Sequence, residues 1–137
     1  MDSKTIIAEE EMIKLKDLIT EREDFQYIAS ELVKNYGLKS KVKFGTGKDY
    51  ADYVPETDTI KLRTNYPNVK QFLITVLHEI GHALDAQKLG HKKFKKKYDQ
   101  AGTMAAHGGL DPHDDNKWEK RAEDWAKREV KKWIDKF

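Results

Sequence analysis

The stretch His78-Glu79-Ile80-Gly81-His82 constrains the fold of this chain more than any other feature of its sequence. Residues four apart lie one turn above each other on the same face of an α-helix. In a helix, His78 and His82 can therefore present two imidazole nitrogens to one metal ion. Glu79 lies beside them, where it can take a proton from a water that the ion activates. The motif thus predicts a helix that carries a metal site.

The residues around the motif predict that helix. Asn68 is a suitable N-cap, with Gln71 three residues later as its capping-box partner, and Gly90 is a typical stop signal. Apolar residues between these ends recur with helical spacing. Because Phe72 to Leu77 is apolar on nearly every side, we expect the helix to run through the core. Two histidines and a glutamate on a buried helix need polar partners, and a metal ion supplies them.

The composition limits which ligands can hold a metal. The chain has no cysteine, so disulfides and Cys-ligated zinc are excluded, and histidine and carboxylate must supply the ligands. The 137 residues suffice for one domain, which we expect to span 1–137. Neither an apolar run of membrane-spanning length nor a signal-peptide pattern occurs, so we expect no membrane segment and a cytoplasmic location. A net charge of +2 gives no global sign of nucleic-acid binding.

We expect two helices at the N-terminus. The first covers about Thr5 to Ile19, and a capping box at Thr20 to Glu23 opens the second, which ends at Gly37. These helices form an N-terminal helical part, 1–37. The sheet and the helices of the metal site are expected in 41–137.

Three strands are predicted next. Lys41 to Phe44 alternates polar and apolar residues, as a half-buried strand does. The segments Tyr50 to Val54 and Thr59 to Arg63 are typical of a hairpin with a loop of about four residues. We therefore expect an α+β fold with a small three-stranded, mainly antiparallel sheet before the central helix. If Thr59 to Arg63 is the sheet edge above the site, it could bind an extended substrate by β-addition.

The segment after the central helix is rich in lysine. Five of the six residues from Lys92 to Lys97 are lysines, and Phe94 interrupts them. We interpret the run as the solvated face of a helix that packs inward through Phe94 and Tyr98, because charge runs are commonly solvated faces. Contact of Lys92–Lys97 with nucleic acid or an acidic protein is the alternative that we do not favour.

The last third of the chain is predicted to be a loop and then a helix. Residues 99–115 contain three glycines and a proline, and such long loops are often functional. The loop carries His107, Asp111 and His113, and no spacing rule selects one of them. A helix is expected from near Asp115 to the C-terminus. Three tryptophans are expected to anchor that helix to the core: Trp118, Trp125 and Trp133.

A hydrolytic zinc usually has three protein ligands and one open position, so a third ligand is required. The motif does not continue as xxGxxH, because Asp85 and Lys88 occupy the relevant positions. The other common solution is a glutamate from a later helix, followed four residues on by an acid that orients a histidine. Glu119 and Glu123 have that spacing. Asp85, one turn after His82, is the other candidate for orienting a histidine.

The combined pattern resembles the ImmA/IrrE-like family of small bacterial and phage zinc peptidases, which are HExxH zincins. The resemblance covers roughly Tyr53 to Ala126: a strand pair with an intervening Pro55, the motif continued to Asp85, and Glu119-Lys120-Arg121-Ala122-Glu123-Asp124-Trp125-Ala126. The first glutamate of the last pattern, which matches Glu119, is the family's third zinc ligand. The chain departs from the family pattern at Glu123, where Asn or Asp is usual.

The resemblance implies a minimal zincin fold and a metallopeptidase with one Zn²⁺ per chain, acting on a protein or peptide. His78, His82 and Glu119 would hold zinc, and Glu79 would act as general base on the zinc-activated water. Tyr98, His107 and His113 are unranked candidates for a second donor to the oxyanion or for a substrate contact. The alternative is a regulatory or nucleic-acid-associated binding protein with a structural or vestigial zinc site. A closed structural site would need a fourth ligand, for which His107, Asp111 and His113 are available.

Overall fold

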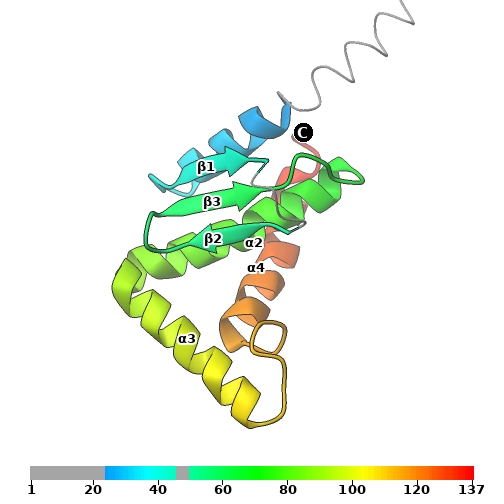
Figure 1. Ribbon diagram of the computed structural model, residues 1–137. Coiled ribbons are helices and arrows are strands. Elements are labelled where there is room, and N and C mark those ends of the chain that lie inside the picture. Colours follow the sequence, from blue (N-terminus) through cyan, green and yellow to red (C-terminus); the bar gives the residue numbers. More distant parts are fainter. Residues whose placement is uncertain (1–23, 46–49) are drawn as a thin grey trace, which may run out of the picture.

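The computed structural model describes residues 24–45 and 50–137, which form an α+β arrangement of four helices and one small sheet (Figure 1). The first described helix covers 24–35. The elements that follow are β1 Lys41–Phe44, β2 Asp52–Val54, β3 Thr59–Leu62, α2 Val69–Leu89, α3 His91–His107 and α4 Lys117–Trp133. The predicted helix over Thr5 to Ile19 and the capping box at Thr20 to Glu23 lie outside the described residues.

The sheet is mixed, and the expectation of a mainly antiparallel sheet was wrong. Its strand order is β1-β3-β2, with β3 parallel to β1 and antiparallel to β2. The predicted hairpin of β2 and β3 is confirmed, because Val54 pairs with Thr59 across a four-residue loop. That hairpin inserts β3 between the two earlier strands. Polar–apolar alternation sets which face of a strand is buried, but it carries no information about which strand lies beside it.

This order also corrects the expectation that Thr59 to Arg63 forms the sheet edge. Both sides of β3 are paired, and its Ile60 and Leu62 are completely buried. The edge strand on the hairpin side is β2, which lies nearest to α3 (Figure 1). An extended chain could therefore add to the sheet at β2, whose outer side faces no other described strand.

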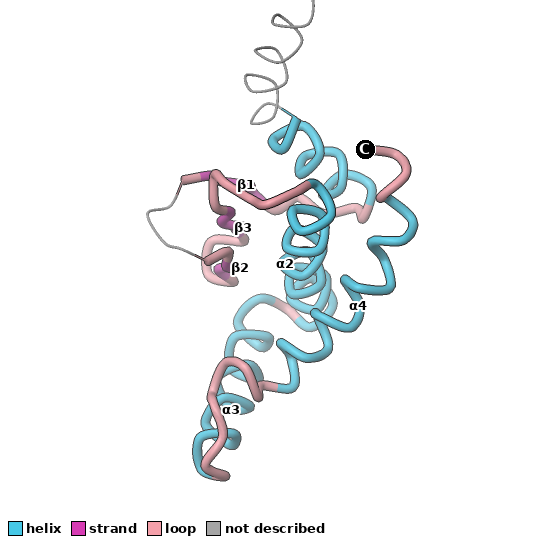
Figure 2. The backbone as a smooth tube through the Cα atoms, turned by 90° about the vertical axis from the view of Figure 1, so that its right-hand side faces the viewer, coloured by secondary structure: helices cyan, strands magenta, loops and turns pink. Residues whose placement is uncertain are grey.

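Helix α2 is the centre of the fold, as its apolar sequence predicted. It lies between the sheet on one side and α4 on the other (Figure 2). Its predicted ends are confirmed: Asn68 accepts a hydrogen bond from the backbone N–H of Gln71, and Gly90 ends the helix at φ 95°. Phe72, fully buried, stacks on Phe25 of the 24–35 helix with ring centroids 4.1 Å apart. This packing joins the first described helix to the core.

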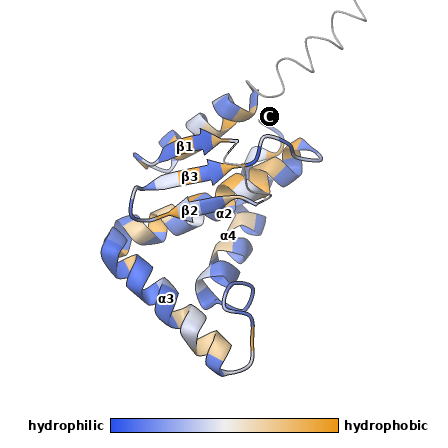
Figure 3. Ribbon diagram, viewed as in Figure 1, coloured by the Kyte–Doolittle hydropathy of each residue, from blue (hydrophilic) through white to orange (hydrophobic). Residues whose placement is uncertain are grey.

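The segment 99–107 is helical, so the prediction of a loop over 99–115 was wrong in its first half. Helix α3 continues to His107, and a shorter connection of 108–116 leads to α4. Gly102 was expected in a loop, but it lies inside α3 at a close contact, where a Cβ would lie 3.1 Å from the carbonyl oxygen of Pro112. The lysine-rich first half of α3 is mostly hydrophilic (Figure 3), while Phe94 is buried as expected.

Helix α4 packs on α2 along one face, and the prediction that three tryptophans anchor this helix to the core is confirmed. Its buried residues are Glu119, Ala122, Ala126 and Val130, spaced three or four apart. The three tryptophans are partly buried beside this stripe and pack against the core. The helix begins at Lys117, with the Asn116 side chain as its cap, and ends at Trp133 rather than at the C-terminus. Within the described residues, no helix has both the length and the apolarity to cross a membrane.

Asp58 joins three parts of the structure through one carboxylate oxygen. Its Oδ1 accepts hydrogen bonds from the Ser40 hydroxyl at 2.6 Å and the Tyr53 hydroxyl at 2.8 Å, and it lies 3.5 Å from Nε2 of His91. Burial opposes its charge, but these partners hold the pKa of Asp58 below its usual value. The residue also has φ 49°, a left-handed conformation that Asp and Asn tolerate better than alanine.

We predict that Asp58→Ala lowers the free energy of unfolding by about 2–3 kcal/mol, from two lost hydrogen bonds and the left-handed backbone. Asp58→Asn, which keeps an acceptor oxygen, should cost about half as much. Because the folded-state pKa is depressed, the carboxylate's contribution is complete above about pH 4 and is lost as the pH falls further. Urea unfolding at pH 7 and pH 3 measures this, with Asp135→Ala as the exposed control. Equal stability of Asp58→Ala and wild type at pH 7 would contradict the role.

Candidate metal centre

The two motif histidines lie on one side of α2, and α4 places a glutamate against both. Nε2 of His78 lies 3.1 Å from Oε1 of Glu119, and Nε2 of His82 is in close contact with the same oxygen. His82 and Glu119 are buried, and the His78 side chain is 18% exposed. The structure therefore brings together the three residues that the sequence predicted as ligands, although 37 positions separate the second histidine from the glutamate.

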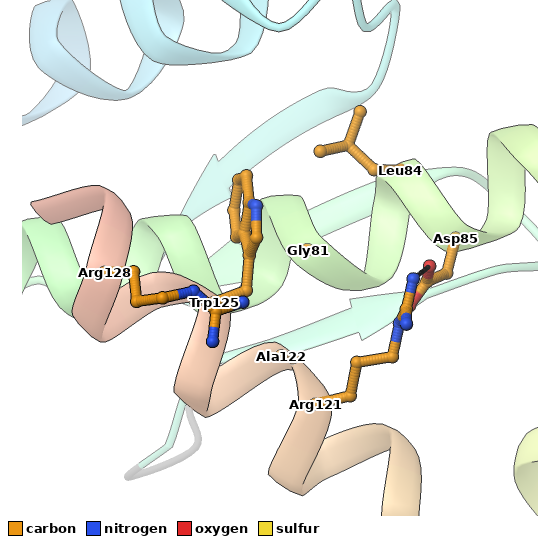
Figure 4. Close-up of a pocket in the computed structure, with 7 residues that line it drawn as sticks. All are labelled: Gly81, Leu84, Asp85, Arg121, Ala122, Trp125 and Arg128. Carbon is orange, nitrogen blue, oxygen red and sulfur yellow. Dashed lines mark hydrogen bonds and ion pairs between the residues drawn. The ribbon is translucent and has the colours of Figure 1, made fainter.

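Glycine in the motif allows this close approach of α4. A Cβ at Gly81 would lie 3.3 Å from the Trp125 ring and 3.4 Å from Cβ of Ala122, so the two helices meet where α2 has no side chain. The close-up of Figure 4 shows the Trp125 ring standing beside Gly81, with Ala122 below it. Ala122 and Ala126, both buried, complete a face of small residues on α4. This contact sets how far the Glu119 carboxylate reaches toward the histidines.

His78 is oriented by the second predicted glutamate. Its Nδ1 lies 2.7 Å from Oε2 of Glu123, one turn beyond Glu119 on α4. A carboxylate can only accept, so Nδ1 carries the hydrogen and Nε2 is left to face Glu119. Burial disfavours a charged imidazole, but the carboxylates of Glu119, Glu79 and Glu123 raise the pKa of His78 to about 9. The two glutamates, spaced four residues apart as predicted, thus have different positions. Glu119 faces Nε2 of both histidines, and Glu123 contacts the opposite nitrogen of His78.

The donor set fits a metal ion. With Nδ1 of His78 donating to Glu123, the Nε2 lone pair points at an anionic oxygen, and a cation between them removes the repulsion. Protons on the imidazoles can remove the same repulsion. Although burial opposes the charge of Glu119, hydrogen bonds from His78 and His82 hold the pKa of this carboxyl group well below its usual range. The coordinating atoms of His78, Glu79 and His82 lie within 4.8 Å of one another. Two imidazoles and a carboxylate suit a borderline-soft divalent ion.

Glu79 is buried beside the histidines and one of its oxygens is unpaired. Its Oε1 lies 3.9 Å from Nε2 of His78, and its Oε2 has no hydrogen-bond partner among the described residues. Burial raises the pKa of Glu79 to about 8; the charge of His78 opposes this, and those of Glu119 and Asp52 add to it. A buried carboxylate with a free oxygen costs stability, and such groups are typical of functional sites.

His113 lies at this centre and His107 does not. Nε2 of His113 is 2.5 Å from Oε2 of Glu119, and its side chain is 69% exposed. His107 is exposed at the end of α3, and no hydrogen bond or ion pair joins its imidazole to another described residue. The loop is fixed by Asp111, whose Oδ1 accepts from the backbone N–H groups of His113 and Asp114 at 2.8 Å each. An Asp two residues before His113 is a local turn signal that could have favoured it over His107.

Tyr98 lies beside His82 in a cleft between β2 and α3. Their ring centroids are 6.0 Å apart, and burial together with the Glu119 charge raises the pKa of Tyr98. The cleft has a volume of about 210 Å³. Asp52 of the edge strand lines it, and nothing in the local sequence near Asp52 indicated a place at the site, because that place depends on strand order. Lys95 bridges the cleft by ion pairs with Glu56 and Asp99 at 3.2 and 3.0 Å.

The other residue predicted to orient a histidine has a different partner. Both oxygens of Asp85 lie 3.2 Å from guanidinium nitrogens of Arg121, and this two-point pair connects α2 to α4 (Figure 4). Nδ1 of His82 is buried without a hydrogen-bond partner within 24–45 and 50–137. Of the two candidates for orienting a histidine, Glu123 contacts His78, and Asp85 instead joins α2 to α4 through Arg121.

Comparison of the chain with family models, with curated proteins and with solved structures found no match. The described geometry of the site itself defines a group that could bind a metal ion: His78, Glu79 and His82.

We predict that Gly81→Val lowers the free energy of unfolding by about 1–3 kcal/mol, because the added methyls overpack the α2–α4 contact. Gly81→Ala is the matched control: its tight contacts are offset by the better helix propensity of alanine, so stability should change by less than about 1 kcal/mol. Urea unfolding compares the two variants with the wild type. A valine variant as stable as the alanine variant would show that the helices do not require glycine here.

Proposed function

We propose that the protein is a zinc-dependent metallopeptidase of the zincin type, related in mechanism to the ImmA/IrrE-like family that its sequence resembles. One observation carries the proposal: two imidazoles of α2 converge on the Glu119 carboxylate of α4, with buried Glu79 beside them. A purely structural network has no need of the unpaired oxygen of Glu79.

His78, His82 and Glu119 would hold the zinc ion, and Glu123 would keep the His78 ring in place. When bound, zinc supplies Lewis acidity: it lowers the pKa of water and polarises a carbonyl group. Three protein ligands leave a coordination position open, as catalysis requires.

Glu79 would act as the general base. Its free oxygen can accept the proton of the attacking water, and its burial makes it a stronger base than an exposed glutamate. The same carboxyl group can then give the proton to the leaving amine as the peptide bond breaks. This double role needs a carboxylate oxygen that is free to take up a proton. Glu79 has such an oxygen, whereas Glu119 is already in contact with both histidines.

His113 is the strongest candidate for the second donor to the developing oxyanion. Its imidazole lies on the solvent side of Glu119, where a substrate would approach, and the Asp111 turn fixes its backbone. Tyr98, half-buried in the cleft, is the other candidate. A donor held in advance at the place where charge develops commonly contributes a rate factor of about 10²–10³.

The cleft between β2 and α3 would receive the peptide. A chain added to the outer edge of β2 would pass His82 and Tyr98, which line the same cleft. The proposed substrate is therefore an extended segment of a protein or peptide rather than a folded surface.

A structural zinc site is the second candidate function, and His113 is the observation that favours it. Because Nε2 of His113 already contacts Glu119, this histidine could close the coordination shell as a fourth ligand. The protein would then be a regulatory binding protein.

We predict about one zinc per chain in protein purified with zinc present, measured by elemental analysis. His78→Ala and Glu119→Ala should lose the metal, and His107→Ala should keep it. Glu79→Gln should retain zinc but lose cleavage of a proteome-derived peptide library, because it keeps the shape of the site without the base. Metal-free protein in every form would reject the proposal. Normal cleavage by Glu79→Gln would reject the assignment of the base.

His107 at the end of α3 and His113 in the connection give a matched pair of variants. We predict that His113→Ala keeps zinc and lowers kcat/KM about 10²-fold through the lost oxyanion donor, while His107→Ala behaves as wild type. Zinc content and cleavage are measured on the same samples. Loss of zinc in His113→Ala would instead identify a fourth ligand and support the structural site.

A further inference from the structure

A second concave surface lies along the contact of α2 with α4. It consists of two neighbouring hollows, of about 180 and 440 Å³, which share Asp85 and Arg121. We call it the α2–α4 groove. Figure 4 shows the first hollow, with Trp125 and Arg128 at one end and the Asp85–Arg121 pair at the other. The second continues toward the end of α2 and the start of α4. No proposed zinc ligand lines either hollow.

The groove is strongly basic for a protein whose net charge is only +2. Its lining contains four cationic side chains and a single carboxylate, Asp85, which Arg121 already neutralises. The other three cations are Lys88, Lys117 and Arg128. In the part of the chain that the structure describes, none of these three has a carboxylate within ion-pair distance. An anionic ligand would meet uncompensated positive charge along the whole groove.

The groove also presents aromatic surface between the charges. Trp125 lines one hollow and Trp118 the other, and both are only partly buried. Arginine guanidinium groups match phosphate geometry, and tryptophan faces are platforms on which bases stack. Along α4, Lys117, Arg121 and Arg128 lie about 6 and 10 Å apart at the rise of an α-helix. Charges for phosphates and aromatic surface for bases thus alternate along one line.

The neighbouring start of α3 adds to the positive potential. Helix α3 begins one residue after α2 ends, and its first two turns carry lysines but no acid. Only Lys95 of that run forms an ion pair within the described residues. Cations in the first turns of a helix oppose its dipole, and lysines four apart repel each other, so the arrangement costs stability in the free protein. A bound polyanion would relieve that cost.

We propose that the α2–α4 groove binds single-stranded nucleic acid. Along the helix sides that line the first hollow, the backbone groups bond within their own helix, so an acidic peptide would find few backbone partners there, whereas a nucleic-acid strand needs only cations and aromatic faces. A narrow hollow between two helices admits one strand more readily than a duplex. The binding is independent of the zinc site and goes beyond the proposed peptidase activity.

The test is fluorescence anisotropy of the full chain with a labelled oligothymidylate of about 15 nucleotides, over a series of salt concentrations. The groove variant is Lys88→Gln/Lys117→Gln/Arg128→Gln, which leaves the Asp85–Arg121 pair intact. The matched control is Lys120→Gln/Lys127→Gln/Lys131→Gln, three lysines of α4 that line neither hollow, with the same change in net charge. Thermal unfolding confirms that both variants fold. A poly-glutamate peptide of equal charge competes for the site.

We expect the wild type to bind with a slope of log K against log salt of about −2, as three phosphate contacts to a single strand give. The groove variant should bind more than 10-fold more weakly with a smaller slope, and the control should stay within about threefold. Equal losses in both variants would overturn the proposal, as would no saturable binding by wild type at low salt. Poly-glutamate that displaces the oligonucleotide at equal concentration would assign the groove to an acidic protein instead.

Discussion

The structure depends on one buried contact, in which two imidazole nitrogens of α2 face a single carboxylate oxygen of α4. That arrangement is repulsive unless a cation or protons occupy the space, so it can exist only in a scaffold that holds both helices firmly. The scaffold meets the requirement with small side chains at the crossing, where Gly81 lies against Ala122 and Trp125. The sheet covers the opposite side of α2 and keeps water from the apolar half of the same helix. Packing thus holds the two helices together at this contact, but only a cation or protons can remove the repulsion between the imidazole nitrogens and the Glu119 carboxylate.

Local sequence signals predicted the parts of this architecture that are local. Asn68 and Gly90 predicted the two ends of α2. The spacing of Glu119 and Glu123 on one helix predicted that both lie at the site. Strand order could not be read in this way. Alternation in β1 is the same whether β2 or β3 lies beside it, and the choice is made when the hairpin inserts β3. The glycine at position 102 favoured a loop in the sequence, whereas the structure places it in α3 against Pro112, a contact with a segment ten residues later that the local sequence could not indicate.

Several residues around the proposed zinc ligands could not be predicted from local sequence either. His107 and His113 could not be ranked by sequence spacing, because their positions depend on where α3 ends and how the connection folds back. The structure separates them: His107 is the exposed last residue of α3, whereas His113 reaches the Glu119 carboxylate. Asp52 and Arg121 also acquire their places only through tertiary contacts, one at a sheet edge and one opposite Asp85. The site residues on α2 and α4 were therefore predictable from their spacing within a helix, whereas the residues whose places depend on the tertiary fold were not.

Gly90 has a mechanical consequence. It is both the last cap of α2 and the first cap of α3, and its backbone lies at φ 95° and ψ 138°, with no side-chain cap on α3. Two torsion angles of one residue therefore set the direction of a lever about 25 Å long. The wall of the cleft, with Phe94 and Tyr98, is the base of that lever, whereas the proposed zinc ligands belong to helices on the fixed side of the joint. A rotation at Gly90 would widen or narrow the cleft, and the hydrogen bond from the Asn116 side chain to the Tyr98 carbonyl would transmit that movement to the start of α4.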